Sequence, residues 1–181
     1  SGTRARTARL YSLHVLGAAM GGAATGVALG GLGDAAGLDG APLPVVGLAA
    51  ALATYLGARE KGKLGRQCQV PRIWARSSRQ NLVALGWGAM LGCGVATLIP
   101  HSAFFLLAGT QLVAGPALGA ASGAVFGAVR QATILHPTMR SSDPQTVMSV
   151  LPRLRRRVAR LNTAVAFAGG VALLLAAWRS L

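Results

Sequence analysis

Hydrophobic and polar positions in this chain alternate in long blocks. The longest apolar block, residues 81–129, contains no Lys, Arg, Asp or Glu and lies between Arg79 and Arg130. Pro100 and His101 divide it into two pieces, each close to the ~20 apolar residues that cross a bilayer as a helix. Because Pro cannot continue a helix but fits a turn, the block predicts a transmembrane helical hairpin. Its tip is expected at these two residues, with both ends on one side of the membrane.

Three further apolar blocks extend the same pattern on either side of this hairpin. Gly recurs at intervals of four residues in several blocks, a spacing that lets membrane helices approach closely. The fourth expected span is longer than a bilayer requires, which predicts tilt or a kink at Gly115-Pro116. The sequence thus predicts an all-α integral membrane bundle in a single domain, with five transmembrane helices. Their expected ranges are residues 12–32, 43–58, 80–99, 103–129 and 163–178.

A different pattern, with a period of three to four residues, occupies the polar segment before the last span. Apolar residues from Val147 to Leu161 recur at this interval, and arginines fill most of the remaining face. The preceding Ser142-Asp143-Pro144 is typical of a helix start, because it supplies a capping side chain and places Pro in the first turn. We therefore expect one interfacial amphipathic helix at the membrane surface.

Composition and charge give the expected spans an orientation. The chain is 52% hydrophobic and 12% charged, whereas soluble domains have about 25% charged residues. Its net charge is +14, and 17 of the 18 Lys and Arg residues lie in residues 1–11, 59–79 and 130–162. Lys and Arg accumulate in cytoplasmic loops. This predicts a cytoplasmic N-terminus, two cytoplasmic basic segments (59–79 and 130–162) and a C-terminus outside, in what we expect to be a bacterial plasma membrane.

The basic segments allow two interpretations. They set the topology and attract anionic lipid headgroups, at about 1 kcal/mol for each Lys or Arg near the surface, or they dock an acidic partner. Nucleic acid is not an expected partner, because these cations lie against a membrane. The arginines expected to contact lipid or a partner are Arg72, Arg76, Arg79, Arg153, Arg156, Arg157 and Arg160.

Polar side chains inside the expected spans are few and uncharged. Cys93 and Thr97 lie in the third span, and Thr110 and Gln111 lie at similar depths in the fourth. They form interhelical hydrogen bonds, worth about 0.6 kcal/mol on average, or they line a polar path between the two helices. No span carries Lys, Arg, Asp or Glu, which argues against proton-coupled transport, because buried charges in membranes are commonly functional.

The sequence offers no catalytic constellation. It lacks a His, Cys, Asp and Glu cluster with metal-ligand spacing and a nucleotide-binding glycine motif after a strand. We therefore assign no catalytic, cofactor or metal residues, and no cofactor. The first hypothesis is a non-catalytic protein, either a subunit that assembles in the bilayer with other membrane proteins or with itself, or a small helical bundle with a solute path. The alternatives are a membrane thiol-redox protein that uses Cys93 and a small-solute transporter or channel.

Three glycine-containing stretches carry a resemblance to known proteins. They are Gly65-Arg66-Gln67 through Trp74, Gly86 through Thr97, and Gly115 through Arg130. In these stretches the chain resembles small polytopic membrane proteins of actinobacteria that are uncharacterised, and more distantly the membrane parts of CcdA- and DsbD-type thiol carriers. The second resemblance implies a thiol relay with one Cys in each of two membrane helices. Here only Cys93 lies in an expected span.

Overall fold

The structure is a computed structural model. It describes residues 2–38, 42–58, 78–94 and 103–140, together with six single positions from Arg160 to Val171. This part of the chain is helical, which confirms the expected all-α class. It contains four helices, namely α1 (Gly2–Ala35), α2 (Pro42–Ala58), α4 (Gln80–Gly92) and α5 (Ala103–Arg140).

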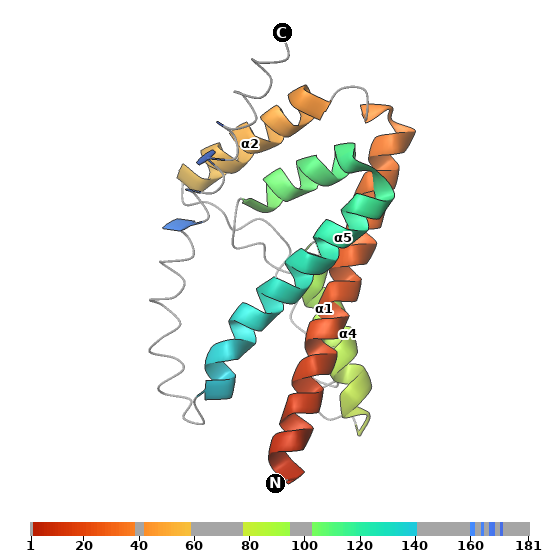
Figure 1. The fold of residues 1–181 in the computed structure, drawn as a ribbon, viewed down its shortest axis with the longest axis vertical. Coiled ribbons are helices and arrows are strands. Elements are labelled where there is room, and N and C mark those ends of the chain that lie inside the picture. The colour runs from red at the N-terminus through yellow and green to blue at the C-terminus, as the bar shows by residue number, and fades with distance from the viewer. Residues whose placement is uncertain are drawn as a thin grey trace.

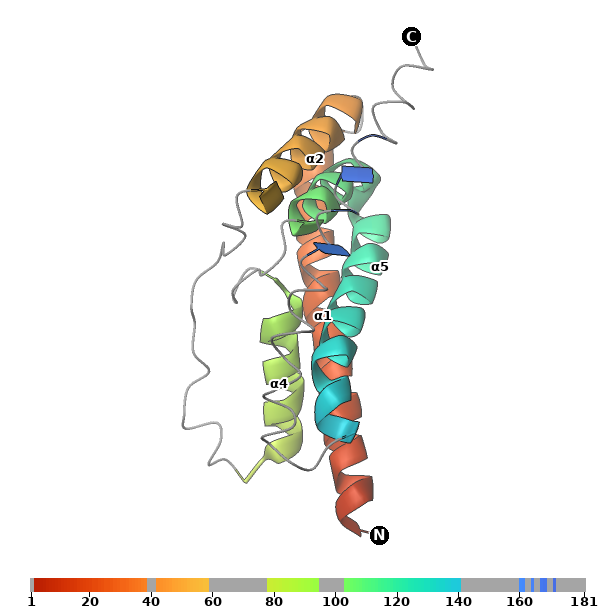
Figure 2. The same cartoon turned by 90° about the vertical axis from the view of Figure 1, so that its left-hand side faces the viewer.

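Helix α1 is the central element of the fold. It runs along the long axis of the molecule, α4 lies beside its N-terminal half, and α5 descends along it from the opposite end (Figures 1 and 2). Helix α2 lies across the far end, against the first part of α5. The contacts of α1 with α5 and with α4 are more extensive than the contacts between α4 and α5. The described bundle is therefore held together mainly through α1.

Glycines set the close approach of α1 to α4. A Cβ on Gly17 would overlap the carbonyl oxygen of Leu85, and a Cβ on Gly92 would overlap that of Ala18. Residue numbers rise together along the two helices, so α1 and α4 are parallel. Without side chains at these positions the two backbones touch, which is how membrane helices gain packing without a hydrophobic drive between them.

A second face of α1 packs on α5 in the same way, but with the opposite direction. A Cβ on Gly22 would overlap the carbonyl oxygen of Gly123, and a Cβ on Gly26 would overlap that of Gly119. Here the numbers rise along α1 as they fall along α5, so the two helices are antiparallel. The sequence spacing of four residues therefore corresponds to two glycine faces on one helix, each with its own partner.

The large apolar side chains lie on the outside of this bundle. Leu118 is 65% exposed and Val125 is 63% exposed, whereas the buried hydrophobic core consists mainly of alanines with Val46 and Phe104. Soluble proteins rarely expose extensive contiguous apolar surface. Small residues inside and large apolar residues outside are the arrangement expected when lipid is the solvent.

Helix α5 is broken at Gly115. This residue has φ 75° and ψ 170°, so the helix consists of two pieces that meet at an angle (Figure 1). A residue before proline is disfavoured in the α region, and this combination of angles is available essentially only to glycine. The Gly115-Pro116 pair explains both why α5 breaks and why it breaks at this point.

The two pieces of α5 fold back on each other. The rings of Phe104 and Phe126 lie 5.6 Å apart, measured between centroids. In one straight helix, 22 residues would separate these positions by about 33 Å. The expected kink is therefore a sharp reversal, and the first piece is too short to cross a bilayer alone.

The expectation of five membrane spans is not supported. Two of the four described helices contain segments that are long and apolar enough to cross a membrane, Ala5–Ala35 and Phe104–Thr133. The second segment includes the reversal at Gly115, so it is not one straight span. The short helix expected at 43–58 is present as α2. The fifth expected span and the interfacial helix fall almost entirely outside the described residues, as do the loop at Pro100 and His101 and most of residues 59–79.

The boundaries of three expected spans also change. Helix α1 begins ten residues before position 12, because Arg, Ala and Leu are good helix formers and extend the helix beyond its apolar part. Helix α4 ends at Gly92 and therefore stops before position 99. Two residues later, Gly94 has φ 71°, which a right-handed helix does not allow. Helix α5 continues past position 129 to Arg140.

Candidate functional site

The reversal in α5 creates a buried polar cluster around Gln111. This side chain is 2% exposed. Its Nε2 donates to the Gly119 carbonyl oxygen at 3.4 Å and to Ser122 Oγ at 3.3 Å, and Ser122 Oγ also donates to Gly119 at 3.1 Å. Gln111 Oε1 is buried and finds no hydrogen-bond partner within the described part of the chain. The cluster thus joins the two pieces of α5 and leaves one acceptor unsatisfied.

Two neighbouring features shape this cluster. Gly123 leaves room for the amide, since a Cβ there would lie 3.2 Å from Gln111 Nε2. Asp34, near the end of α1, places Oδ1 3.6 Å from the position of a Cβ on Gly115. The second piece of α5 begins at that point, and a carboxylate is stabilised near the positive end of a helix dipole. The turn therefore has an acidic group at its outer side and an amide at its inner side.

Two of the four predicted polar path residues bond to the backbone three residues before them. Thr110 Oγ1 donates to Leu107 at 2.7 Å, and Cys93 Sγ donates to Met90 at 3.1 Å. No hydrogen bond within the described residues joins Cys93 to Thr110 or Gln111, and Thr97 lies outside them. The polar path stays a prediction, and Gln111 is the member with an unsatisfied buried atom.

The C-terminal end of α4 receives two hydrogen bonds that the sequence did not reveal. Arg130 Nη1 donates to the Leu91 carbonyl oxygen at 2.9 Å, and Thr25 Oγ1 donates to the Cys93 carbonyl oxygen at 3.0 Å. Helix ends leave four carbonyl groups without intrahelical partners, so these bonds satisfy part of that need. Arg130 was expected beside the start of the third span, and it lies beside the end of α4 instead.

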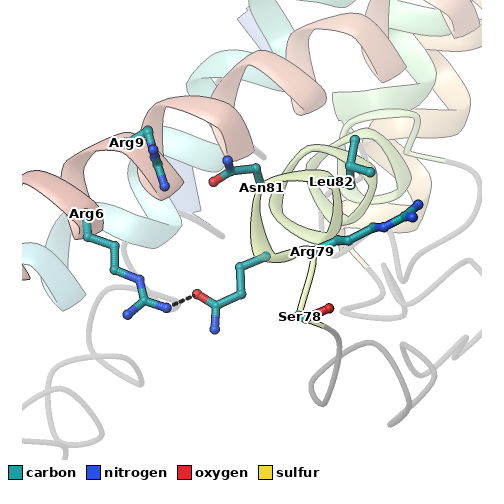
Figure 3. A pocket seen from close by; sticks show the side chains of 7 residues that line it. Arg6, Arg9, Ser78, Arg79, Asn81 and Leu82 are labelled. Carbon is teal, nitrogen blue, oxygen red and sulfur yellow. Dashed lines mark hydrogen bonds between the residues drawn. The ribbon is translucent and has the colours of Figure 1, made fainter.

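A second polar region lies at the opposite end of the bundle, where α1 and α4 begin (Figure 3). It is a hollow of about 360 Å³, and we call it the arginine hollow. Arg6 and Arg9 project from α1 toward the first turn of α4, and Arg6 Nη2 donates to Gln80 Oε1. Arg79 extends from the other side of that turn. The residues that line the hollow are Arg6, Arg9, Ser78, Arg79, Gln80, Asn81 and Leu82.

Positive charge accumulates in the arginine hollow because of the direction of the helices. The parallel arrangement places the N-termini of α1 and α4, both positive dipole ends, at the same end of the bundle. The residue at the N-cap of α4, Arg79, makes no side-chain capping hydrogen bond. None of the described residues that line the hollow is acidic. An uncapped helix start between arginines is suited to an anion.

The other predicted docking arginines are only partly placed. Arg79 lies at the arginine hollow, and Arg160 is exposed. The remaining five fall outside the described residues, namely Arg72, Arg76, Arg153, Arg156 and Arg157. Sequence reasoning treated the N-terminal arginines only as topology signals, because nothing in the sequence shows that α4 starts beside them.

Comparison with protein-family models, with curated proteins and with solved structures finds no match for this chain. Within the described residues, no three His, Cys, Asp or Glu side chains come together as a possible metal site. The features that bear on function are the arrangement of the helices, the Gln111 cluster and the arginine hollow.

Proposed function

We propose that this chain is a non-catalytic assembly component of a membrane, a compact helical bundle that associates with other membrane polypeptides or with further copies of itself. The observation that carries the proposal is the distribution of side chains. The glycine faces of α1 pack against α4 and α5 inside the bundle, and large apolar side chains such as Leu32 and Leu118 are exposed. Such a surface requires lipid or another apolar helix against it.

Small residues on the outer faces favour other helices as part of that environment. On α1, Ala24, Ala28 and Ala35 are exposed, and Gly31, which lies on the same face, has open space where a Cβ would be. Their spacing of four, three and four residues places them on one helical face. Small residues at such intervals let a second membrane helix approach closely. We define Ala24, Ala28, Gly31 and Ala35 as the outer stripe of α1.

The proposed topology follows from the charges. Arg6, Arg9 and Arg79 lie at one end of the bundle, and Asp34 lies near the other end of α1. Lys and Arg favour the cytoplasmic side, so we place the N-terminal end of α1 in the cytoplasm. The outside C-terminus and the bacterial plasma membrane belong to the same proposal.

Native mass spectrometry from a mild detergent tests the assembly. We expect a complex with a partner or a defined oligomer, which Ala24→Leu together with Ala28→Leu disrupts while the fold is retained. Ala51→Leu is the matched control, because Ala51 is exposed on α2 and lies outside the outer stripe of α1. A lone monomer at every concentration, or equal disruption by the control, would argue against the proposal.

One observation favours a solute path as the second candidate function. Gln111 Oε1 and Gln131 Oε1 are both buried without a partner within the described part of the chain. Buried acceptors are normally satisfied by a protein group or ordered water, so these two atoms provide binding positions for water or a hydroxyl-bearing solute. Liposome flux tests this function. We expect Gln111→Leu to abolish flux, whereas flux that survives Gln111→Leu would refute the path.

The thiol-redox alternative makes a separate prediction. Cys93 lies at the end of α4 and is half-buried, and its thiol donates to Met90. If Cys93 relays electrons, Cys93→Ser abolishes function and thiol trapping. Unchanged function in this variant would dispose of the redox hypothesis and leave the assembly proposal in place.

A further inference from the structure

We propose that the arginine hollow is a binding site for the phosphate of an anionic phospholipid headgroup. The site consists of Arg6 and Arg9 on α1, with Gln80 and Asn81 at the first turn of α4. It requires that α1 lies in a bilayer, as in the proposed function, but it does not require that the chain assembles with other subunits.

Two guanidinium groups converge on this site from one helix. Arg6 and Arg9 are three residues apart, so they lie on the same face of α1, and both point toward the start of α4 (Figure 3). Each guanidinium is a planar fork that can donate two hydrogen bonds to one phosphate. Arg6 is held in place by its hydrogen bond to Gln80. No hydrogen bond or ion pair within the described part of the chain fixes Arg9, which is therefore available to a ligand.

Within the described part of the chain, no acidic side chain compensates the charge of this site. The positive end of the α4 dipole lies at the hollow, and every described residue that lines it is neutral or cationic. The only acidic residue in the described part of the chain is Asp34, near the other end of α1. An anion would neutralise this charge and accept hydrogen bonds from the arginines and from the Asn81 amide.

The size and position of the hollow favour a lipid over a soluble anion. Its volume of about 360 Å³ equals roughly a dozen waters at ~30 Å³ each, which accommodates a phosphate with part of its hydration. Leu82 forms one wall and is 61% exposed, and Trp87 is exposed five residues further along α4. Apolar surface therefore adjoins the arginines directly, so the acyl chains of a lipid whose phosphate is bound here would lie along α4.

The test is lipid binding to the purified, delipidated full chain in mild detergent, measured by native mass spectrometry. The probes are phosphatidylglycerol, phosphatidylcholine and inorganic phosphate. The variants are Arg6→Gln with Arg9→Gln, and Arg9→Gln alone, which keeps the Arg6–Gln80 hydrogen bond. The matched control is Lys61→Gln with Lys63→Gln, which removes the same charge from a basic segment. Thermal unfolding in detergent checks that each variant is folded.

We expect the wild-type chain to retain one phosphatidylglycerol preferentially over phosphatidylcholine. The double arginine variant should retain it on the order of tenfold to thirtyfold more weakly, Arg9→Gln alone should weaken it severalfold, and the lysine control should change it little. Equal weakening in the lysine control would show general charge attraction and overturn the site. Inorganic phosphate that displaces the lipid at equal concentration would overturn a lipid ligand. Either result leaves the assembly test unaffected.

Discussion

Helices α1 and α5 have similar composition and opposite behaviour. Both are apolar and rich in small residues, and both pack glycine faces against each other. Helix α1 contains eight glycines in 34 residues and stays continuous, whereas α5 contains five in 38 residues and reverses at one of them. The number of glycines therefore does not decide whether a helix breaks.

The difference lies in the neighbours of each glycine. Six of the eight α1 glycines face backbone atoms of α4 or α5, so their missing side chains are used for close packing. Gly115 is followed by Pro116, which disfavours the helical conformation at the residue before it. Gln111 before the break donates a hydrogen bond to Ser122 after it, which holds the two pieces together. A packing glycine is thus distinguished by the backbone of another helix against it, and the hinge glycine by the proline that follows it.

The largest expected effect is at the packing glycines. A Cβ at Gly26 would overlap the carbonyl oxygen of Gly119, and this neighbour is backbone that cannot rotate away. We expect Gly26→Ala to separate α1 from α5 and to lower the free energy of unfolding by at least about 3 kcal/mol, the upper range for overpacking. Thermal or denaturant unfolding in detergent measures this change.

Gly31→Ala is the matched control for that prediction. Gly31 lies in the same helix and has nothing within 4 Å of the position of a Cβ. The substitution should leave stability unchanged or raise it by up to about 1 kcal/mol through helix propensity. Equal destabilisation at both positions would mean that the observed α1–α5 contact is wrong.

The second largest effect is at the hinge. A Cβ on Gly115 meets only the Asp34 carboxylate at ordinary contact distance, so Gly115→Ala is not blocked by packing. Its cost comes from the backbone angles, and we expect a loss of about 1–3 kcal/mol. In Gly115→Ala with Pro116→Ala, both causes of the break are removed, and α5 should straighten.

Spin labels at positions 104 and 126 report that change. In the otherwise wild-type chain the two positions are close, because the Phe104 and Phe126 rings are in contact range. In the double variant the separation should grow toward about 33 Å, the length of 22 helical residues. An unchanged short distance would show that other contacts, and not Gly115-Pro116, hold the reversal.

The same comparison shows what the sequence could predict. The apolar blocks identified the approximate positions of α1, α2, α4 and α5, because a long run of apolar residues is a local signal that can be read from the sequence. Gly115-Pro116 was recognisable as a break. The angle of the break was not, because it depends on the sign of φ at Gly115 and on contacts between residues that are far apart in the chain, such as Phe104 and Phe126.

The candidate sites were predictable to different extents. Gln111 was recognisable as the amide in an apolar block, but its partner Ser122 is brought to it only by the reversal. The arginine hollow was not predictable, because Arg6 and Gln80 are 74 residues apart and meet only through the parallel packing of α1 and α4. Sequence shows which residues are unusual, and the direction of each helix determines which of them meet.

A smaller effect is expected when the hydrogen bonds across the reversal are removed. Gln111→Leu has a similar volume and loses the donor to Gly119 and Ser122, and it also removes the unsatisfied Oε1. We expect a loss of about 0.5–1.5 kcal/mol in the free energy of unfolding. Ser122→Ala should cost less, because Gln111 keeps its bond to Gly119. A Gln111→Leu variant more stable than wild type would show that the unsatisfied oxygen outweighs both bonds.

The smallest expected effect is at Thr25, which tests whether polar bonds matter in α1 as they do in α5. Thr25 Oγ1 is shared between the Gly21 carbonyl oxygen in its own helix and the Cys93 carbonyl oxygen at the end of α4. Thr25→Val keeps the shape and removes both bonds, and the expected loss is about 0.6 kcal/mol, the average for hydrogen bonds between membrane helices. Hydrogen exchange should increase at the last turn of α4 and remain unchanged in α5. A loss as large as that at Gly26 would mean that α1 is held by its polar groups, and that its continuous glycine faces are not the main source of its stability.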